Sequence, residues 1–337
     1  MIKVAVVILN WNGQKFLEKF LPEVVKHSST FASVFVADNA STDDSVLFLK
    51  KNFPEVKVIE NSENGGFAKG YNDALSKIDA EYYVLLNSDI EVSKNWIPPV
   101  IELMDSDQKI AACQPKICSF QEPSKYEYAG ASGGYIDKLG YPFCRGRLFQ
   151  SIEEDKGQYD DITEIFWATG ACMFVRAKVF HDLGGLDSDF FAHMEEIDFC
   201  WRAKNSSYKI MVCPKSVVYH VGGGTLPKSS SRKTYLNFRN DLILLYKNLP
   251  SNRLFYVFII RFILDCIAAF KFLVEGGLMD FIAVVRAHLS FYKSILKNKE
   301  KRQRMKHMPV TEVYNGSIVI AYFIKRKKFF SQLKFPR

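Results

Sequence analysis

Two acidic side chains stand at the ends of predicted strands in this 337-residue chain. Asp38 follows the apolar run 34–37, and Asp89 comes shortly after the apolar run 83–86. Such runs predict buried parallel strands, and open α/β sheets bind ligands at the carboxyl ends of their strands. We therefore expect both carboxylates in one crevice, although each has an alternative role as a turn or capping residue. The crevice suits a ligand that brings its own cation, such as a nucleotide diphosphate with Mg²⁺ or Mn²⁺.

A third acidic cluster contains Glu195, Glu196 and Asp198. Helical spacing over 195–204 predicts that Glu195 and Asp198 share one face, while Glu196 points elsewhere. The helix dipole favours carboxylates in a first turn, so the cluster has a purely structural interpretation. Burial among other carboxylates would instead raise one pKa and prepare a general base.

Two further segments are candidates for ligand contacts. The glycine-rich segment 64–70 matches neither a dinucleotide-binding fingerprint nor a P-loop. Its glycines still permit a close backbone approach, and the helix that follows attracts negative charge; the alternative is a plain turn. His220 ends the predicted strand 217–220 before Gly222, Gly223 and Gly224. It is either a metal or phosphate contact or a structural histidine.

Alternating strands and helices position these residues. The pattern predicts strands at 3–9, 33–38, 56–60 and 82–87. They are separated by helices at 14–27 and 43–52 and by a helix that the segment 64–72 opens and that runs to about 78. This order is typical of a parallel sheet covered by helices. Residues 110–165 are rich in glycine, tyrosine and turn residues, so we expect long loops and short strands there. Later strands are expected at 167–175 and 217–220.

The charge of the chain is divided unevenly. Its net charge is +8, yet residues 230–337 hold 21 Lys and Arg against 6 Asp and Glu. The seven cysteines are scattered without a CxxC pair, which favours a reducing cytosol over a disulfide framework or a structural zinc site. The N-terminus begins with a strand pattern, so we expect no signal peptide.

The stretch 253–275 is strongly apolar, but after its first residue, Arg253, four charges interrupt it, and they fall within an arc of roughly 120°. They form two opposite-charge pairs at i,i+4 spacing: Arg261 with Asp265, and Lys271 with Glu275. A membrane-spanning helix does not normally carry four charges. The pattern predicts an amphipathic helix that lies in a membrane interface, or else packs on the catalytic domain or a second subunit. The apolar stretch 278–296 and the basic runs 297–306 and 325–328 favour anionic lipid. No recognition motif for nucleic acid is present.

Together these segments resemble the family-2 glycosyltransferases of the GT-A fold, and most of all a bacterial rhamnosyltransferase-like branch. The resemblance covers about residues 3–225, and the order and spacing of its motifs are highly specific. The motifs lie at 7–13, 38–43, 64–72, 85–89, 169–176, 184–191, 195–202 and 220–225.

The resemblance implies an α/β fold with a Rossmann-like, mostly parallel central sheet flanked by helices. A nucleotide-sugar-binding catalytic domain would occupy residues 1–229. A basic, amphipathic helical region would occupy residues 230–337, where it would associate with a membrane or form a homo-oligomer. The activity implied is that of an inverting transferase using a divalent cation, Mg²⁺ or Mn²⁺.

The resemblance also assigns roles to single residues. Asp38 would hold a pyrimidine base, Asp89 would be the metal-binding carboxylate of the DxD-like motif, and His220 would contact the metal or the diphosphate. Glu196 falls on the family's general base, which deprotonates the acceptor hydroxyl. The other expected donor-binding positions are Asn10, Asn12, Asn64, Gly65, Gly66, Lys69, Asn72 and Asn87.

Two positions depart from the family pattern. Asn87 replaces the first Asp of the DxD motif, which leaves fewer carboxylates for a metal. Glu196 replaces the usual Asp, and a side chain longer by one methylene displaces the carboxylate by about 1 Å, an error that can be costly in a catalytic group. Glu195 and Asp198 therefore remain alternative bases.

The resulting hypothesis is a cytoplasmic enzyme, peripheral at the inner face of the cytoplasmic membrane, that builds a bacterial surface polysaccharide. The donor would be a TDP-sugar or UDP-sugar, with rhamnose as one candidate sugar, and the acceptor a lipid-linked saccharide. The alternatives are a sugar nucleotidyltransferase and a non-catalytic, degenerate transferase subunit. Residues 10–14 lack the phosphate loop that the first alternative requires.

Overall fold

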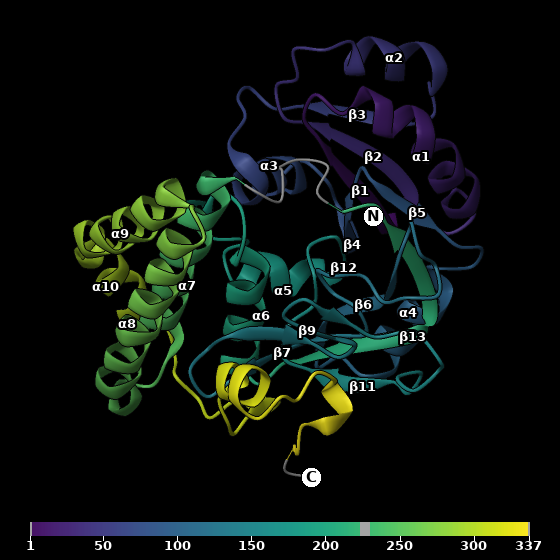
Figure 1. The fold of residues 1–337 in the computed structure, drawn as a ribbon. Coiled ribbons are helices and arrows are strands. Elements are labelled where there is room, and N and C mark those ends of the chain that lie inside the picture. Colours follow the sequence, from purple (N-terminus) through teal and green to yellow (C-terminus); the bar gives the residue numbers. More distant parts are fainter. Residues whose placement is uncertain (1, 223–229, 336–337) are drawn as a thin grey trace.

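The computed structural model describes residues 2–222 and 230–335. Its first part alternates strands and helices (Figure 1), which confirms the predicted order. The elements are β1 (Ile2–Asn10), α1 (Gln14–Ser28), β2 (Ser33–Asp38), α2 (Ser45–Asn52), β3 (Lys57–Glu60), α3 (Gly66–Leu75), β4 (Ala80–Asn87), β5 (Ile90–Val92) and α4 (Pro98–Ser106). In β1, side chains of residues 4–8 are buried on both faces of the sheet, as expected of a central parallel strand.

The main sheet has the strand order β11-β13-β6-β12-β4-β1-β2-β3, with β5 paired to β13. Its other strands are β6 (Ile110–Ser119), β11 (Thr163–Ile165), β12 (Cys172–Arg176) and β13 (Lys209–His220). The run β4-β1-β2-β3 is parallel, whereas β12 is antiparallel to both β4 and β6. The sheet is therefore parallel across β4, β1, β2 and β3 and mixed in its other strands. This corrects the expectation of a mostly parallel sheet.

Strand β6 corrects the expectation of loops and short strands at 110–165. This ten-residue strand is central to the sheet, and polar residues that interrupt its apolar pattern are nevertheless buried. The Gln114 side chain accepts a hydrogen bond from the Thr169 amide, and Lys116 lies 2.6 Å from a carboxylate oxygen of Asp155. Because distant partners satisfy these groups, the local pattern did not identify the strand.

The rest of that segment confirms the expectation of short strands, which form a second sheet of order β10-β9-β8-β7-β14. Its strands are β7 (Gly134–Asp137), β8 (Pro142–Cys144), β9 (Arg147–Leu148), β10 (Ser151–Ile152) and β14 (Val313–Tyr314). The strand β14 comes from the far end of the chain and pairs in parallel with β7. The C-terminal region therefore completes a sheet of the preceding residues.

Helices cover both faces of the main sheet. Side chains of α1 and α4 pack on one face, and those of α3, α5 (Ala177–Asp182) and α6 (Glu195–Asn205) pack on the other. Four helices then follow at the side of the molecule (Figure 1). They are α7 (Ser231–Asn248), α8 (Ser251–Val274), α9 (Leu278–Lys293) and α10 (Ile295–Gln303).

The C-terminal region packs tightly on the catalytic part through α7, which contacts α6 and α9. The expected boundary between residues 229 and 230 lies at the edge of residues 223–229, which are outside the described residues, so the division remains a prediction. Among the described residues, no helix has the length and apolar character needed to cross a membrane.

Candidate active site

The ends of β1 and β2 bring Asn10 and Asp38 together. The two residues are register partners, and the Asn10 amide donates a hydrogen bond of 3.1 Å to one Asp38 carboxylate oxygen. The other oxygen accepts a hydrogen bond of 2.9 Å from the Ser41 backbone amide. Both side chains are buried, and Asn10 Oδ1 has no hydrogen-bond partner. A ligand donor at this edge of the sheet would satisfy that acceptor.

Hydrogen bonds of Asn12 link the loop after β1 to the loop after β2. Its side-chain oxygen accepts a hydrogen bond of 2.7 Å from the Thr42 backbone amide, and its backbone N–H donates one of 2.9 Å to Ser41 Oγ. These contacts fix the rim of the site next to Asp38, so Asn12 shapes the loop that faces the strand ends.

The start of α3 is held by an asparagine network. Asn64 Oδ1 accepts hydrogen bonds of 3.0 Å from the Gly66 amide and from the Asn39 side chain. Gly66 has a φ of +78°, and a Cβ there would lie 2.4 Å from the carbonyl oxygen of Phe191. The segment therefore needs glycine both for its backbone conformation and for a close approach. Asn39 is a site residue that the sequence analysis did not single out.

Two predicted donor-binding residues of α3, Lys69 and Asn72, already contact other residues of the protein. Lys69 Nζ lies 2.5 Å from Asp73 and 3.3 Å from Glu63. Asn72 donates to the Leu186 carbonyl and accepts from the Leu186 amide. Gly65 directly precedes the helix, with the Lys69 side chain packed over it. Lys69 and Asn72 would have to give up these contacts to bind a donor.

Asp89, His220 and Glu127 form a buried row beyond the end of β4. Asp89 Oδ1 lies 3.2 Å from His220 Nε2, and Glu127 Oε1 lies 3.4 Å from His220 Nδ1. The second contact is not directed as a hydrogen bond, because Nδ1 has no hydrogen-bond partner. Burial would lower the pKa of His220, but the two carboxylates raise it to about 10. Asn87, which ends β4, is partly exposed nearby.

The protein supplies only part of a cation site here. No group of three or more His, Cys, Asp or Glu side chains in residues 2–222 and 230–335 is arranged to hold a metal ion. Asp89 offers one carboxylate and Asn87 only a carbonyl oxygen, while His220 can offer an imidazole nitrogen only after it loses the proton that the two carboxylates favour. Cations that bind with nucleotides take their remaining ligands from phosphates and water. The residues therefore fit Mg²⁺ or Mn²⁺ brought by a diphosphate better than a cation held by the protein alone.

The acidic cluster of Glu195, Glu196 and Asp198 follows a strained loop. Phe191, His193 and Met194 have φ values of 64°, 71° and 76°, in a region that non-glycine residues rarely adopt. Asn240 of α7 stabilises this loop, because its buried amide group donates to the carbonyl oxygens of Phe190, Ala192 and His193 at 3.0, 2.8 and 2.7 Å. The sequence contained no motif that pointed to Asn240.

The three carboxylates of α6 have different surroundings. Asp198 is fully buried, with Lys247 Nζ 2.8 Å from one oxygen and Arg202 Nε 2.9 Å from the other. Burial would raise the pKa of Asp198, but Lys247 and Arg202 outweigh it and hold that pKa below its usual range. Asp198 therefore joins α6 to α7 as an ionised group.

Glu195 and Glu196 each have a buried carboxylate oxygen without a hydrogen-bond partner. Burial first, and the Glu196 charge second, raise the pKa of Glu195 well above its usual value. Burial raises the pKa of Glu196 to about 7. The Glu196 residue is partly exposed whereas Glu195 is buried, so Glu196 is the more accessible of the two.

More than half of the chain matches a known family. The sequence model described as Glycosyl transferase family 2 matches residues 5–184. The chain belongs to glycosyltransferase family 2. This confirms the family inferred from motif order, and the protein is a glycosyltransferase enzyme.

Two relatives of this glycosyltransferase cover most of its length. The low-salt glycan biosynthesis hexosyltransferase Agl10 of Haloferax volcanii is 24% identical over 250 residues, or 71% of this chain and 74% of that protein. An N-acetylglucosaminyl-diphospho-decaprenol L-rhamnosyltransferase of Mycobacterium tuberculosis is 23% identical over 233 residues, or 64% of this chain and 75% of that protein.

Solved structures confirm the GT-A fold of the transferase. Mannosyltransferase PcManGT from Pyrobaculum calidifontis, in complex with GDP-Man and Mn²⁺, has a TM-score of 0.51 at 14% identity, covering 90% of this chain and 84% of that one. GalNAc-T7 with UDP, GalNAc and Mn²⁺ has a TM-score of 0.57 at 16% identity, covering 74% of this chain. The match spans about half of GalNAc-T7, at 49% of its length.

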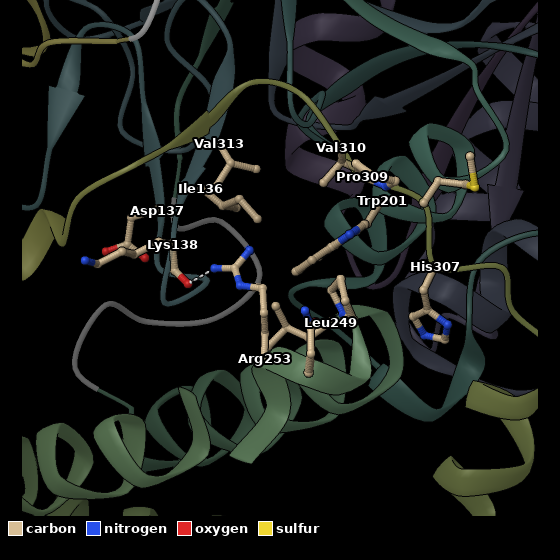
Figure 2. Close-up of a pocket in the computed structure, with 13 residues that line it drawn as sticks. Ile136, Asp137, Lys138, Trp201, Leu249, Arg253, His307, Pro309, Val310 and Val313 are labelled. Atoms are coloured by element: carbon tan, nitrogen blue, oxygen red, sulfur yellow. Dashed lines mark hydrogen bonds between the residues drawn. The ribbon is translucent and has the colours of Figure 1, made fainter. Parts of the chain in front are cut away.

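One cavity of the transferase lies outside the region formed by the strand ends. It has a volume of about 340 Å³ and lies between the start of α8 and the segment 307–313 (Figure 2). Arg253 extends across it and donates to the carbonyl oxygen of Lys138. None of the predicted site residues lines this cavity, so we do not assign it to donor binding.

Proposed function

We propose that this glycosyltransferase moves a sugar from a pyrimidine nucleotide-diphospho-sugar to a saccharide acceptor linked to a lipid. The proposal is carried by two features that occur together. One is the buried Asp38–Asn10 pair at the strand ends, where Asn10 Oδ1 has no hydrogen-bond partner. The other is the Glu196 carboxyl, whose pKa is raised. The first provides a polar edge that can read a nucleobase. The second provides a group that can accept a proton near neutral pH.

In this mechanism Glu196 removes the proton from an acceptor hydroxyl while that oxygen attacks the anomeric carbon of the donor. A new C–O bond forms to the acceptor as the C–O bond to the diphosphate breaks, which inverts the anomeric configuration. Asp38 and Asn10 hold the base of the donor, and Asp89 and His220 orient the diphosphate. A bound Mg²⁺ or Mn²⁺ supplies positive charge that stabilises the departing diphosphate.

Glu196 is our choice of base over its two neighbours. Asp198 has both oxygens engaged by Lys247 and Arg202, so it has no free oxygen with which to accept a proton. Glu195 is buried, and burial together with the Glu196 charge raises the pKa of its carboxyl well above its usual value. Glu196 combines partial exposure with a pKa of about 7, which is favourable for a base that works near neutral pH.

The names of relatives support the donor and acceptor classes. The mycobacterial relative is a rhamnosyltransferase whose named acceptor is a diphospho-decaprenol-linked sugar. Two structural neighbours hold Mn²⁺, one with the pyrimidine nucleotide UDP and one with the purine nucleotide sugar GDP-Man, so they support a nucleotide donor with a cation rather than one base. Rhamnose from TDP-rhamnose is accordingly the first donor to test, with UDP-hexoses next. A lipid-linked acceptor would place the enzyme at the inner face of the cytoplasmic membrane.

A transfer assay tests the proposal. TDP-rhamnose and UDP-N-acetylglucosamine are each supplied with Mn²⁺ and N-acetylglucosaminyl-diphospho-decaprenol, and the product is analysed by mass and anomeric configuration. We expect one added sugar with inverted configuration, lost in the Glu196→Gln variant. Retention of configuration, or an undiminished rate in Glu196→Gln, would contradict the mechanism.

A further inference from the structure

The two central charges of helix α8 face the rest of the protein. Arg261 and Asp265 are each 1% exposed, although both lie in a very apolar helix. Arg261 pairs with Asp241 of α7 and lies over the Tyr141 ring at 3.8 Å. Asp265 lies 3.1 Å from His288 Nε2 of α9. The polar stripe of α8 is therefore used to attach the helix to the rest of the protein.

The opposite side of α8 is apolar and exposed. Between Arg253 and Lys271 no charged side chain of this helix is exposed. At 1.5 Å per residue, the 24-residue helix is about 36 Å long. Phe255 is 80% exposed and Val274 is 87% exposed near its two ends. The exposed apolar residues between them include Ile259, Phe262, Ile263, Ile267 and Phe270.

Helix α9 extends this surface. It packs against α7 and α8 through the buried residues Ala283, Val284, Ala287 and Phe291. Its other side exposes Leu278, Met279, Ile282, Val285 and Leu289. We call the exposed apolar residues named here on α8 and α9 the α8–α9 face. Soluble monomers rarely expose continuous apolar surfaces of this extent, so the face calls for a partner.

Charged residues beside the face indicate which partner it fits. Arg286 and Lys293 are exposed at the edge of the apolar side of α9. On the next helix Lys297 pairs with Asp189 at 2.6 Å, and Lys299 is exposed beside Glu300. Lys271 is paired with Glu275 at 3.3 Å, so the net charge at the border is positive. An anionic lipid surface attracts such a border. Two copies of this chain joined through the face would instead set basic border against basic border.

We propose that the α8–α9 face docks on an anionic bilayer leaflet, with α8 and α9 parallel to the membrane plane and their apolar side chains among the acyl chains. The proposal rests on the proposed function, which places a lipid-linked acceptor at a membrane. The docking proposal adds which surface of the protein meets the membrane and how α8 and α9 are oriented there. The face lies on the side of the molecule that the C-terminal helices form, with α7 between it and α6 (Figure 1). Docking thus leaves the strand-end region uncovered.

Flotation with vesicles tests the proposal. The full chain is mixed with vesicles of phosphatidylethanolamine and phosphatidylglycerol, or of phosphatidylcholine alone. We expect binding to the anionic vesicles, weakened by salt, and little binding to phosphatidylcholine. The variant Phe262→Glu with Ile267→Glu should lose at least tenfold in partitioning. The matched control, Phe31→Glu with Leu47→Glu, changes two exposed apolar residues of the catalytic part and should bind like the unaltered chain.

Charge variants and oligomeric state complete the test. Arg286→Ala with Lys293→Ala should reduce partitioning into anionic vesicles by roughly thirtyfold. Undiminished binding of the Phe262→Glu, Ile267→Glu variant would overturn the proposal. Light scattering that shows a dimer lost in this variant would also overturn it, because the face would then join two copies.

The donor site provides an independent readout in each variant. Stabilisation by UDP or TDP with Mn²⁺ should be unchanged in all of them. A chain that binds nucleotide but not vesicles contradicts the docking proposal alone. A chain that binds vesicles but neither nucleotide contradicts the proposed function alone.

Discussion

Asn240 of α7 donates a hydrogen bond of 2.7 Å to the carbonyl oxygen of His193, two residues before Glu195. It links the C-terminal helices to the loop that delivers the expected base. Two further bonds from the same amide group fix the loop in its left-handed conformation. The C-terminal region therefore contributes to the geometry of the active site as well as to its surroundings.

The Asn240→Ala variant should lower kcat by roughly tenfold to a hundredfold, because a displacement of about 1 Å in a catalytic group has effects of this size. Donor affinity should change little, since Asp38 and Asp89 lie on other elements. Asn298→Ala is the matched control, because Asn298 is buried but bonds only to Ser294 within its own stretch of helix. Equal losses of kcat in both variants would argue against a positioning role for Asn240.

The pH dependence of activity should follow Glu196. With a pKa of about 7 in the folded protein, kcat/KM should rise as pH increases through 7 and then level off. Stability should change in the opposite direction. A carboxyl whose pKa is raised by folding stabilises the fold most below its unfolded pKa, near 4.5, and this contribution is lost as pH rises towards 7. Rate profiles and denaturation midpoints across pH 4 to 8 measure both trends.

Mutation should distinguish the roles of the carboxylates of α6. Glu196→Gln should abolish transfer while the fold and nucleotide binding persist. Asp198→Asn should instead lower stability by about 3 to 5 kcal/mol, because Lys247 and Arg202 would lose a buried anionic partner. Chemical denaturation and transfer rates measure the two effects. Near-full activity in Glu196→Gln, with loss in Glu195→Gln, would move the base by one residue.

Glu127 should act on cation binding through His220. Glu127 Oε1 lies 3.4 Å from His220 Nδ1, and a small reorientation on cation binding would make this contact a hydrogen bond. A carboxylate bonded to the second nitrogen fixes the orientation of a metal-binding histidine, and its loss typically costs tenfold to a hundredfold in metal affinity. Glu127→Gln should therefore weaken the Mn²⁺ dependence of nucleotide binding, measured by calorimetry, without changing the preference among bases. An unchanged Mn²⁺ affinity would assign Glu127 a structural role only.

Sequence alone predicted the strand ends well, because buried parallel strands are continuous apolar runs and their carboxyl ends converge. Asn10, Asp38 and Asn87 accordingly lie at neighbouring ends of β1, β2 and β4. Glu127 and Asn240 were not predicted, since their importance comes from partners 93 and 47 residues away. Periodicity located the charged stripe of α8, but which side would face the protein depended on Asp241 and His288.

The most direct test of the central claim is a thermal-shift panel of TDP, UDP, GDP and CDP, each with Mn²⁺ or with EDTA, on the unaltered chain and on Asp89→Ala. A ligand that binds the native state raises the midpoint by mass action. The account predicts a shift with TDP or UDP that requires Mn²⁺ and is lost in Asp89→Ala. The absence of a shift with every nucleotide, or a full shift in Asp89→Ala, would contradict it.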